Sequence, residues 1–243
     1  MIVLTNIWKA FGEKQVHSGV DLTVNDRETT VVLGRSGGGK SVLLKMIIGL
    51  IKPDSGSILV DGKEVTGMSF KQLQRLRFKF GFLFQGAALF DSMTVGENIM
   101  LALRRHSDYT EAIIQEKMRY ALNLVKLDNV HNLMPSSLSG GMKKRVGLAR
   151  AIALTPKYML YDEPTTGLDV ETADGINLLI NELKKELGVT SIVVTHDVHS
   201  AFVVGDRFGI FEQGQFIAQG TKEEIRNSSN DNVRKYIESE IQT

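Results

Sequence analysis

The sequence predicts an α/β fold with a helical insertion, and two observations lead to this prediction. Short apolar runs alternate with helical segments, and several of these runs end in polar residues. Such runs are typical of buried parallel strands, whose carboxyl ends carry the chemistry of α/β proteins. From Thr94 to Leu127, however, strand patterns disappear. We therefore expect one domain over 1–243, with a core at about 1–86 and 156–243 and a helical subdomain at about 87–155.

Hydrophobic periodicity and turn residues place the individual elements. Strands are predicted in ETTVVLG (28–34), YMLYDEP (158–164) and SIVVTHD (191–197). One helix is predicted in SVLLKMIIGL (41–50), which Pro53 follows, and another is predicted to start at Thr94. The segment YTEAIIQEKMRYALNLVKL (109–127) is predicted to be helical throughout, and a further helix is predicted after Ala173, ending at Gly188. FGIFEQGQFIAQG (208–220) is expected to form a hairpin, followed by a capping box from Thr221 to Glu224.

Composition excludes several classes of protein. The chain has 29 Lys and Arg against 28 Asp and Glu, so its net charge of +1 gives no argument for nucleic acid or an anionic membrane as a partner. Because there is no cysteine, disulfides, thiolate nucleophiles and cysteine-ligated metals are excluded, which fits a reducing cytoplasm. No window approaches the roughly 18 apolar residues of a membrane span, and no secretory signal begins the chain, so we expect a soluble, unexported protein.

A glycine-rich loop lies between a predicted strand and a predicted helix. The segment GRSGGGKS fits the P-loop pattern G-x-x-x-x-G-K-[ST]. Its main-chain N–H groups and the helix N-terminus can hold phosphate oxygens, Lys40 can reach the β- and γ-phosphates, and the Ser41 hydroxyl can bind Mg²⁺. The alternative is a glycine turn without a ligand, which the flanking strand and helix disfavour. The predicted phosphate site consists of Gly34, Arg35, Ser36, Gly37, Gly38, Gly39, Lys40 and Ser41.

Two adjacent carboxylates follow the apolar run at YMLYDEP. Asp162 is placed to bind Mg²⁺ through water, and Glu163 is suited to polarise the attacking water. Such a pair alone is usually an N-cap with a solvated neighbour. The P-loop in the same chain favours the catalytic interpretation.

The segment LSGGMKKRVGLARA offers a second anion-binding helix terminus. Ser139 is a good N-cap, and Gly140 and Gly141 leave main-chain N–H groups uncovered. One phosphate chain does not need two such sites from one protomer. The basic run from Lys143 to Arg145 is expected to form the solvated face of this helix.

Six motifs, found in a fixed order over nearly the whole chain, identify a family resemblance. The P-loop, Gln85, LSGGM, YDEP, GLD and His196 resemble those of an ATP-binding cassette (ABC) ATPase. The resemblance implies a P-loop NTPase fold with a mixed or parallel sheet core, an antiparallel β-subdomain and the inserted helical subdomain. It also implies ATP and Mg²⁺ as ligands, and a head-to-tail homodimer in which LSGGM of one protomer closes the γ-phosphate site of the other.

The same resemblance assigns roles to further residues. Phe11 should stack on adenine, where the family more often has tyrosine, His196 should contact the γ-phosphate, and Asp169 of GLD should lie at the dimer interface. Val170 stands where the family often has proline. The remaining histidines are expected to be surface or core residues; they are His17, His106, His131 and His199.

The stretch GFLFQGAALFDSMTVGENI links this site to a partner. The resemblance places Gln85 beside Mg²⁺ and the γ-phosphate, so its amide can sense nucleotide at the hinge of the helical subdomain. Exposed Phe90 and Met93 would line a groove for a helix of a membrane permease. The alternative is that both residues pack inside the helical insertion.

Longer segments are similar to the Mla-type (MlaF/Mkl-like) phospholipid-transport ATPases. They are GKSVLLKMIIGL, LFQGAALFDSMTVGENI and LSGGMKKRVGLARAIAL, whereas the tail NVRKYIESE departs from that family's ending. This resemblance implies a peripheral ATPase at the cytoplasmic face of the inner membrane. Its partners would be a permease, an MCE lipid-binding protein and a small STAS-domain protein, without nucleic acid.

Two other functions remain open at this point. A soluble ABC protein of DNA repair or translation would normally contain a long coiled-coil insertion or a second cassette, and 243 residues hold neither. The ATPase of a small-solute importer, for example an amino-acid importer, is the nearer alternative. The permease that co-purifies with the chain would distinguish it from a lipid transporter.

Overall fold

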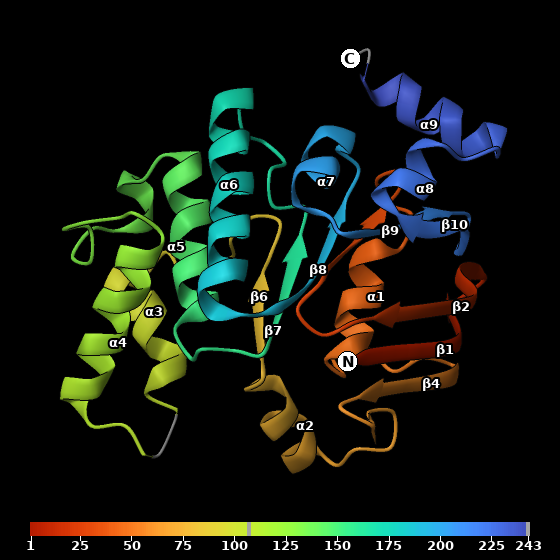
Figure 1. The fold of residues 1–243 in the computed structure, drawn as a ribbon. Helices are drawn as coiled ribbons and strands as arrows, with labels where there is room; N and C mark the ends of the chain where they lie inside the picture. Colours follow the sequence, from red (N-terminus) through yellow and green to blue (C-terminus); the bar gives the residue numbers. More distant parts are fainter. Residues whose placement is uncertain (106–107, 242–243) are drawn as a thin grey trace. The chain divides into compact units, whose positions relative to one another are not determined.

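The structure is a computed structural model, and it describes residues 1–105 and 108–241 (Figure 1). The chain forms two compact units: the first comprises 1–77 and 190–243, and the second comprises 78–189. Both units combine helices with strands, so the α/β class predicted from the sequence is confirmed. The prediction for His106 lies outside the described residues.

The first unit contains an antiparallel sheet and a mixed sheet (Figure 1). The antiparallel sheet has the order β2-β1-β4-β5. In the mixed sheet, β3 pairs in parallel with both β8 and β9, and β9 pairs antiparallel with β10, as predicted for the hairpin. These strands are β1 (Ile2–Phe11), β2 (Lys14–Val24), β3 (Thr29–Leu33), β4 (Ser55–Val60), β5 (Lys63–Glu64), β8 (Thr190–Thr195), β9 (Arg207–Glu212) and β10 (Gln215–Thr221).

The helices of the first unit begin where local chemistry favours a start. The helix α1 begins at Lys40, directly after the glycine-rich loop. The capping box predicted from Thr221 to Glu224 is present and begins α8. The last helix, α9, packs against α7. The helices are α1 (Lys40–Ile47), α2 (Phe70–Arg77), α7 (Val198–Val204), α8 (Lys222–Arg226) and α9 (Asp231–Ile241).

The second unit has a parallel strand pair and a group of helices that pack against one another (Figure 1). The helix α5 packs on β6 and contacts α3, α4 and α6. Thr94 begins α3 and left-handed Gly188 ends α6, both as predicted, and the structure adds a complete capping box at Thr94. The elements are β6 (Phe80–Leu83), α3 (Val95–Leu103), α4 (Glu111–Leu124), the 3₁₀ turn η1 (Pro135–Ser137), α5 (Gly140–Ile152), β7 (Tyr158–Asp162) and α6 (Val170–Leu187).

The prediction of a helix throughout 109–127 was wrong at both ends. The helix α4 begins at Glu111 because the Thr110 hydroxyl accepts a hydrogen bond from the Ile113 N–H. It ends at Leu124, and Val125 is buried just beyond it. Apolar residues beyond Leu124 therefore remain buried like the apolar face of the helix, although the chain there is no longer helical.

The central strands are buried as their continuous apolar runs predict. Every residue of β3, β7 and β8 is buried, which is expected of strands covered on both faces. Within residues 1–105 and 108–241, no helix is both long enough and apolar enough to cross a bilayer.

Candidate functional site

The glycine-rich loop of the first unit has the backbone of a phosphate cradle. Gly37 and Gly39 have φ angles of 75° and 101°, in the left-handed region that side chains disfavour. A Cβ on Gly39 would lie 2.5 Å from Val16 Cγ1, so the close approach of β2 also requires glycine there. The buried Lys40 turns into the loop, where its Nζ donates to the carbonyl oxygens of Gly34 (2.6 Å) and Arg35 (3.0 Å).

The base of the loop is anchored between two strands of the same sheet. The Gly34 N–H donates to the Thr195 carbonyl at the end of β8, at 3.2 Å. A Cβ on Gly34 would lie 2.3 Å from the main-chain oxygen of Phe211 in β9. His196 directly follows Thr195, so the loop and this histidine lie at the same end of β3 and β8.

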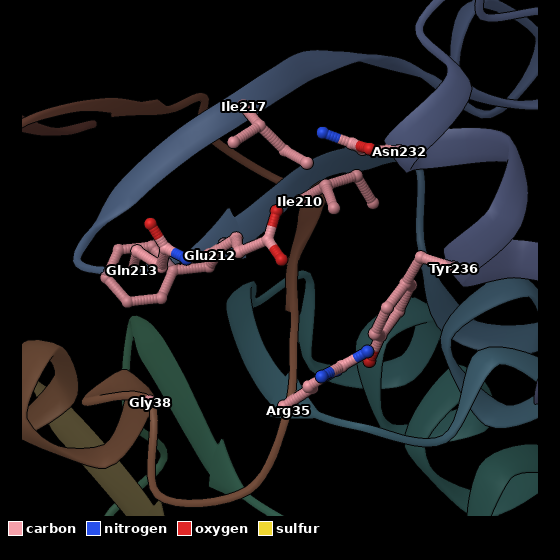
Figure 2. Close-up of a pocket in the computed structure, with 9 residues that line it drawn as sticks. Arg35, Gly38, Ile210, Glu212, Gln213, Ile217, Asn232 and Tyr236 are labelled. Atoms are coloured by element: carbon pink, nitrogen blue, oxygen red, sulfur yellow. The ribbon is translucent and has the colours of Figure 1, made fainter.

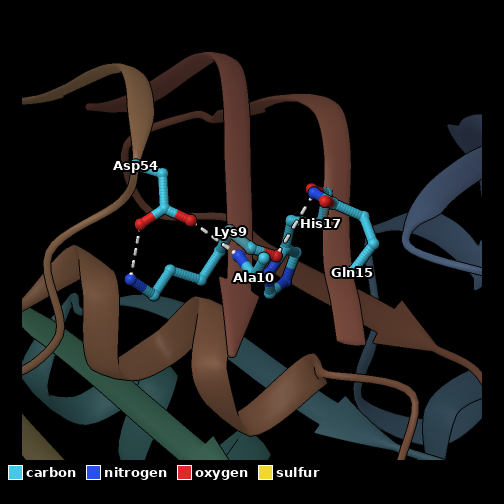
Figure 3. A network of polar contacts seen from close by, with 5 residues as sticks. All are labelled: Lys9, Ala10, Gln15, His17 and Asp54. Atoms are coloured by element: carbon cyan, nitrogen blue, oxygen red, sulfur yellow. Dashed lines mark hydrogen bonds and ion pairs between the residues drawn. The ribbon is translucent and has the colours of Figure 1, made fainter. Parts of the chain in front are cut away.

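Phe11 is presented by the end of β1. Its ring is 48% exposed, and Lys9 Nζ lies 5.2 Å from the ring centroid. The Asp54 carboxylate holds this strand end, because it accepts from Lys9 Nζ at 2.8 Å and from the Ala10 N–H at 2.7 Å (Figure 3). The bond from Lys9, followed by that from Ala10, lowers the pKa of Asp54. The main chain next to Phe11 is therefore fixed while the ring stays accessible.

His17 is a core residue beneath the glycine-rich loop. Its ring is fully buried, 5.5 Å from the ring of Phe211, and Gln15 Nε2 donates to its main-chain oxygen (Figure 3). Burial lowers the pKa of the His17 imidazole to about 4, against a weaker opposing influence of the Gly39 backbone. Of the other two described histidines outside the predicted site, His131 is half-buried and His199 is exposed.

A cavity of about 700 Å³ adjoins the glycine-rich loop (Figure 2). The loop contributes Arg35 and Gly38 to its wall, β9 contributes Ile210, and α9 contributes Tyr236. The side chains of Arg35 and Tyr236 point toward one another, and the Tyr236 hydroxyl donates to the His196 carbonyl at 3.4 Å. The C-terminal helix therefore lies on the same side of this unit as the loop and His196.

In the second unit, β7 delivers the two predicted carboxylates. Asp162 and Glu163 are 5% and 6% exposed. Glu163 has a φ angle of 50°, which is left-handed and unusual for a side chain of this size. Its Oε2 accepts a hydrogen bond from the Thr166 hydroxyl at 3.0 Å. The carboxylate is therefore oriented by a residue three positions further along the chain.

The prediction of a solvated basic face on α5 was wrong. Lys144 is only 5% exposed, and its Nζ donates to the main-chain oxygens of Gln85 and, at 3.0 Å, of Glu163. Burial lowers the pKa of Lys144 to about 8, while the charges of Glu163 and Asp162 oppose this effect. Arg145 is half-buried and donates to the Val125 carbonyl at 3.0 Å. This face of the helix meets other main-chain segments instead of water.

The start of α5 is exposed, as an anion-binding terminus requires. Ser139 is its N-cap and accepts from the Met142 N–H at 3.3 Å. A Cβ on Gly141 would lie 2.6 Å from Thr172 Cγ2. Asp169, the exposed N-cap of α6, accepts from the N–H and the hydroxyl of the same Thr172, and these bonds lower the pKa of Asp169. Thr172 therefore connects the two predicted interface segments.

The loop after β6 presents Gln85 and Phe90 to the surface. Both side chains are exposed, Phe90 by 49%, whereas Met93 is half-buried. Fully buried Asn98 organises the loop: its Oδ1 accepts from the Phe90 N–H at 2.8 Å, and its Nδ2 donates to three carbonyls. Those three carbonyls belong to Phe90, Met93 and Thr94.

The predicted site residues thus form two groups, one in each unit. The first unit carries Phe11, the loop from Gly34 to Ser41, and His196; the second carries Gln85, the segment from Ser139 to Gly141, Asp162, Glu163 and Asp169.

Four residues hold the site segments of the second unit in place without having been assigned that role from the sequence: Lys144, Arg150, Thr166 and Asn98. One signal was available for the first two. Gly147 stands inside a helix, at a spacing of three from both Lys144 and Arg150, and a glycine there indicates that another segment approaches closely.

The chain is similar to known proteins over most of its length. Residues 17–166 match the family model described as ABC transporter. A relative from Mycobacterium bovis, the probable ribonucleotide transport ATP-binding protein mkl, is 37% identical over 97% of this chain and 66% of its own. The chain thus spans slightly less than two thirds of that relative. The intermembrane phospholipid transport system ATP-binding protein MlaF of Haemophilus influenzae is 36% identical over 99% of this chain and 91% of its own.

Solved structures share the fold. The dimeric post-hydrolysis state of the ATP-binding cassette MJ0796, bound to ADP and Pi, matches with a TM-score of 0.83 and 31% identity over 91% of this chain and 98% of that one. The structure of cbiO1 from Clostridium perfringens, part of the transporter complex cbiONQ, matches with a TM-score of 0.85 and 30% identity over 93% of this chain and 90% of that one.

Proposed function

The chain belongs to the ABC transporter family, and we propose that it is the ATP-hydrolysing subunit of a phospholipid transporter. The main support for ATP binding and hydrolysis is the glycine-rich loop, in which the left-handed Gly37 and Gly39 form a phosphate cradle directly before α1. The proposal that the transported substrate is a phospholipid rests on the similarity to MlaF over almost the whole chain.

Binding of ATP falls to the first unit. The loop residues from Gly34 to Ser41 hold the phosphates through main-chain N–H groups, and Lys40 exchanges its loop carbonyls for the β- and γ-phosphates. The exposed ring of Phe11 stacks on adenine. The donor set fits a polyphosphate, because it combines an amide-lined cradle with a lysine that already points into it.

Hydrolysis also needs the polar groups of the second unit. Glu163 acts as the general base toward the attacking water, and Gln85, together with His196 of the first unit, orients the γ-phosphate and that water. Oxygen ligands from Ser41, Asp162 and Gln85 suit Mg²⁺, which would neutralise charge on the phosphates. The role of this chain is to place one buried carboxylate and one amide where the water attacks.

Two copies complete the site. The surface that meets the partner includes Asp169 and the segment from Ser139 to Gly141, in which Ser139 and Gly140 are exposed and Gly141 is half-buried. In this arrangement Ser139 closes the γ-phosphate held by the partner's P-loop. The dimeric state of the cassette MJ0796 supports a homodimer.

The loop after Gln85 couples the ATPase to a membrane permease. We assign residues 87–155 to a helical subdomain that moves with nucleotide. Phe90 is exposed on a loop that Asn98 holds rigid, so it can receive a permease helix in the way that apolar grooves receive amphipathic helices. Half-buried Met93 contributes the rim of that groove.

The proposed assembly acts at the cytoplasmic face of the inner membrane. The permease carries phospholipid, an MCE lipid-binding protein receives or delivers it, and a small STAS-domain protein binds the ATPase. The ATPase of a small-solute importer remains the second candidate.

The test is to purify the chain with its permease and identify the bound molecule by mass spectrometry. Phospholipid supports the proposal, and an amino acid or nucleotide in its place overturns the assigned substrate. The ATPase part is tested separately with Lys40→Ala. This variant should bind ATP more weakly, because a charge that contacts phosphate is lost in the ground state as well as in the transition state.

A further inference from the structure

We propose that Lys144 is a positioning residue for hydrolysis, which fixes the main chain at both Gln85 and Glu163 from the helix that begins at Ser139. The inference rests on the proposed roles of Gln85 and Glu163. It assigns a task to a buried cation that touches neither nucleotide nor metal in the proposed site.

The geometry around Lys144 supports this task. Its ammonium lies between two chain segments and donates to one carbonyl oxygen in each, that of Gln85 and that of Glu163. These acceptors are 59 and 19 residues away in sequence. A single buried donor therefore fixes the distance between the residue proposed to sense nucleotide and the residue proposed to activate water.

The segments held in this way have backbone conformations that need support. Glu163 has a φ angle of 50°, and Ala87 and Ala88, just after Gln85, have φ angles of 59° and 47°. Residues with side chains keep such angles only where their surroundings over-determine them. Loss of the Lys144 bond removes one of the contacts that hold the main chain at Glu163, so we expect the Glu163 carboxylate to shift from the position that the attacking water needs.

Arg150 performs the matching task six residues further along α5. Its Nη1 and Nη2 donate to the carbonyls of Ala88 (2.7 Å) and Ala87 (2.6 Å). Between the two cations, Gly147 lets the helix approach, since a Cβ there would lie 2.8 Å from Leu83 Cδ1 and 3.1 Å from Ala87 Cβ. One side of α5 thus contacts the loop after β6 through three residues, which are Lys144, Gly147 and Arg150.

This arrangement has a mechanical consequence. The helix that presents Ser139 to the partner protomer also holds Glu163 of its own protomer. A shift of α5 on engagement of Ser139 is then transmitted to Glu163 through Lys144. The rate of ATP hydrolysis in the site that contains this Glu163 thereby depends on whether Ser139 of the same protomer has engaged the nucleotide in the other site of the dimer.

The test compares Lys144→Met, which keeps length and loses the donor, with Lys144→Arg, which keeps charge and donors. Steady-state ATPase activity, nucleotide affinity and Tm are measured on the full chain. We expect kcat to fall about 10- to 100-fold in Lys144→Met, because a misplacement near 1 Å can cost about 10²-fold. The Kd for ATP should stay within about twofold of wild type, since the P-loop is unchanged, and Lys144→Arg should recover most of kcat.

Lys143→Met is the matched control, because Lys143 is the adjacent residue on the same helix, whereas the carbonyls of Gln85 and Glu163 accept from Lys144. It should have wild-type kcat. A normal kcat in Lys144→Met overturns the proposal, and so does an equal loss of kcat, ATP affinity and Tm, which indicates a role in folding alone. If Lys144→Met does not fold, a folded Lys144→Leu, which also lacks a donor, overturns the proposal in the same way when its kcat is that of wild type.

Glu163→Gln in the same assay separates this inference from the proposed function. If Glu163→Gln is active, the general base itself is wrongly assigned. If Glu163→Gln is inactive while Lys144→Met is normal, only the positioning role fails.

Discussion

The Thr166 hydroxyl donates a hydrogen bond of 3.0 Å to the Glu163 carboxylate, which is 6% exposed at the end of β7. Glutamine at position 163 can accept the same bond through its amide oxygen, so Glu163→Gln should preserve the local structure. We expect it to retain ATP binding and to lose about 10²- to 10⁴-fold in hydrolysis, the range for removal of a positioned acid–base group. It should also accumulate an ATP-bound dimer, measurable by size-exclusion chromatography with light scattering. Near-normal turnover would place the base elsewhere.

A mixing experiment tests whether Ser139 acts in the partner's site. Ser139→Arg and Lys40→Ala homodimers each have two damaged sites, whereas their heterodimer has one intact site and one doubly damaged site. Mixing the two inactive proteins should therefore raise ATPase activity above that of either alone. The control is each variant mixed with itself. The trans arrangement is contradicted if no activity returns and the ATP-bound Glu163→Gln protein remains a monomer at every concentration.

Phe90→Asp tests the coupling groove. A charge buried at the permease contact should cost several kcal/mol of association. The isolated chain should fold and bind ATP normally, because Asn98 holds the loop through the main chain of Phe90. We expect loss of co-purification with the permease and loss of lipid transport in cells.

Phe70→Asp is the matched control for this experiment, since Phe70 is 71% exposed on α2. It should leave transport intact. A large drop in the Tm of Phe90→Asp would instead assign Phe90 to the packing of the helical segment. Stable protein with normal transport would place the groove elsewhere.

His17 should make stability fall at acid pH. Its folded pKa, lowered by burial to about 4, lies below the unfolded value near 6.5. The unfolded chain binds the proton first, so stability is complete above pH 6.5 and is lost as pH falls toward 4. The loss amounts to about 2 kcal/mol at pH 5, or about 4–8 °C in Tm.

Thermal unfolding of wild type and His17→Leu at pH 7.5 and pH 5 measures this contribution. The drop in Tm between the two pH values should be smaller in His17→Leu, whatever its Tm at neutral pH. Equal drops in both proteins would show that other groups cause the acid sensitivity.

Helix ends whose hydrogen bonds are made by residues within one turn could be predicted from the sequence alone. Thr94 predicted a helix start, Thr221 a helix start with a capping box, and Gly188 a helix end, because each satisfies backbone groups within one turn. The glycine-rich loop was also recognisable from the sequence, because glycine permits the left-handed angles of Gly37 and Gly39, although the close approach of β2 to Gly39 appears only in the structure. The ends of α4 were less predictable because apolar residues past Leu124 remain in the core.

Only the tertiary structure decided which charged and polar side chains are buried. A run of three basic residues on α5 predicts a solvated face, yet Lys144 is buried because carbonyls from two distant segments replace its water. His17 is likewise buried, next to Phe211 of a distant strand, by contacts that no local pattern encodes. Long-range packing determines the neighbours of a side chain, and those neighbours determine whether its charge or polarity can leave water.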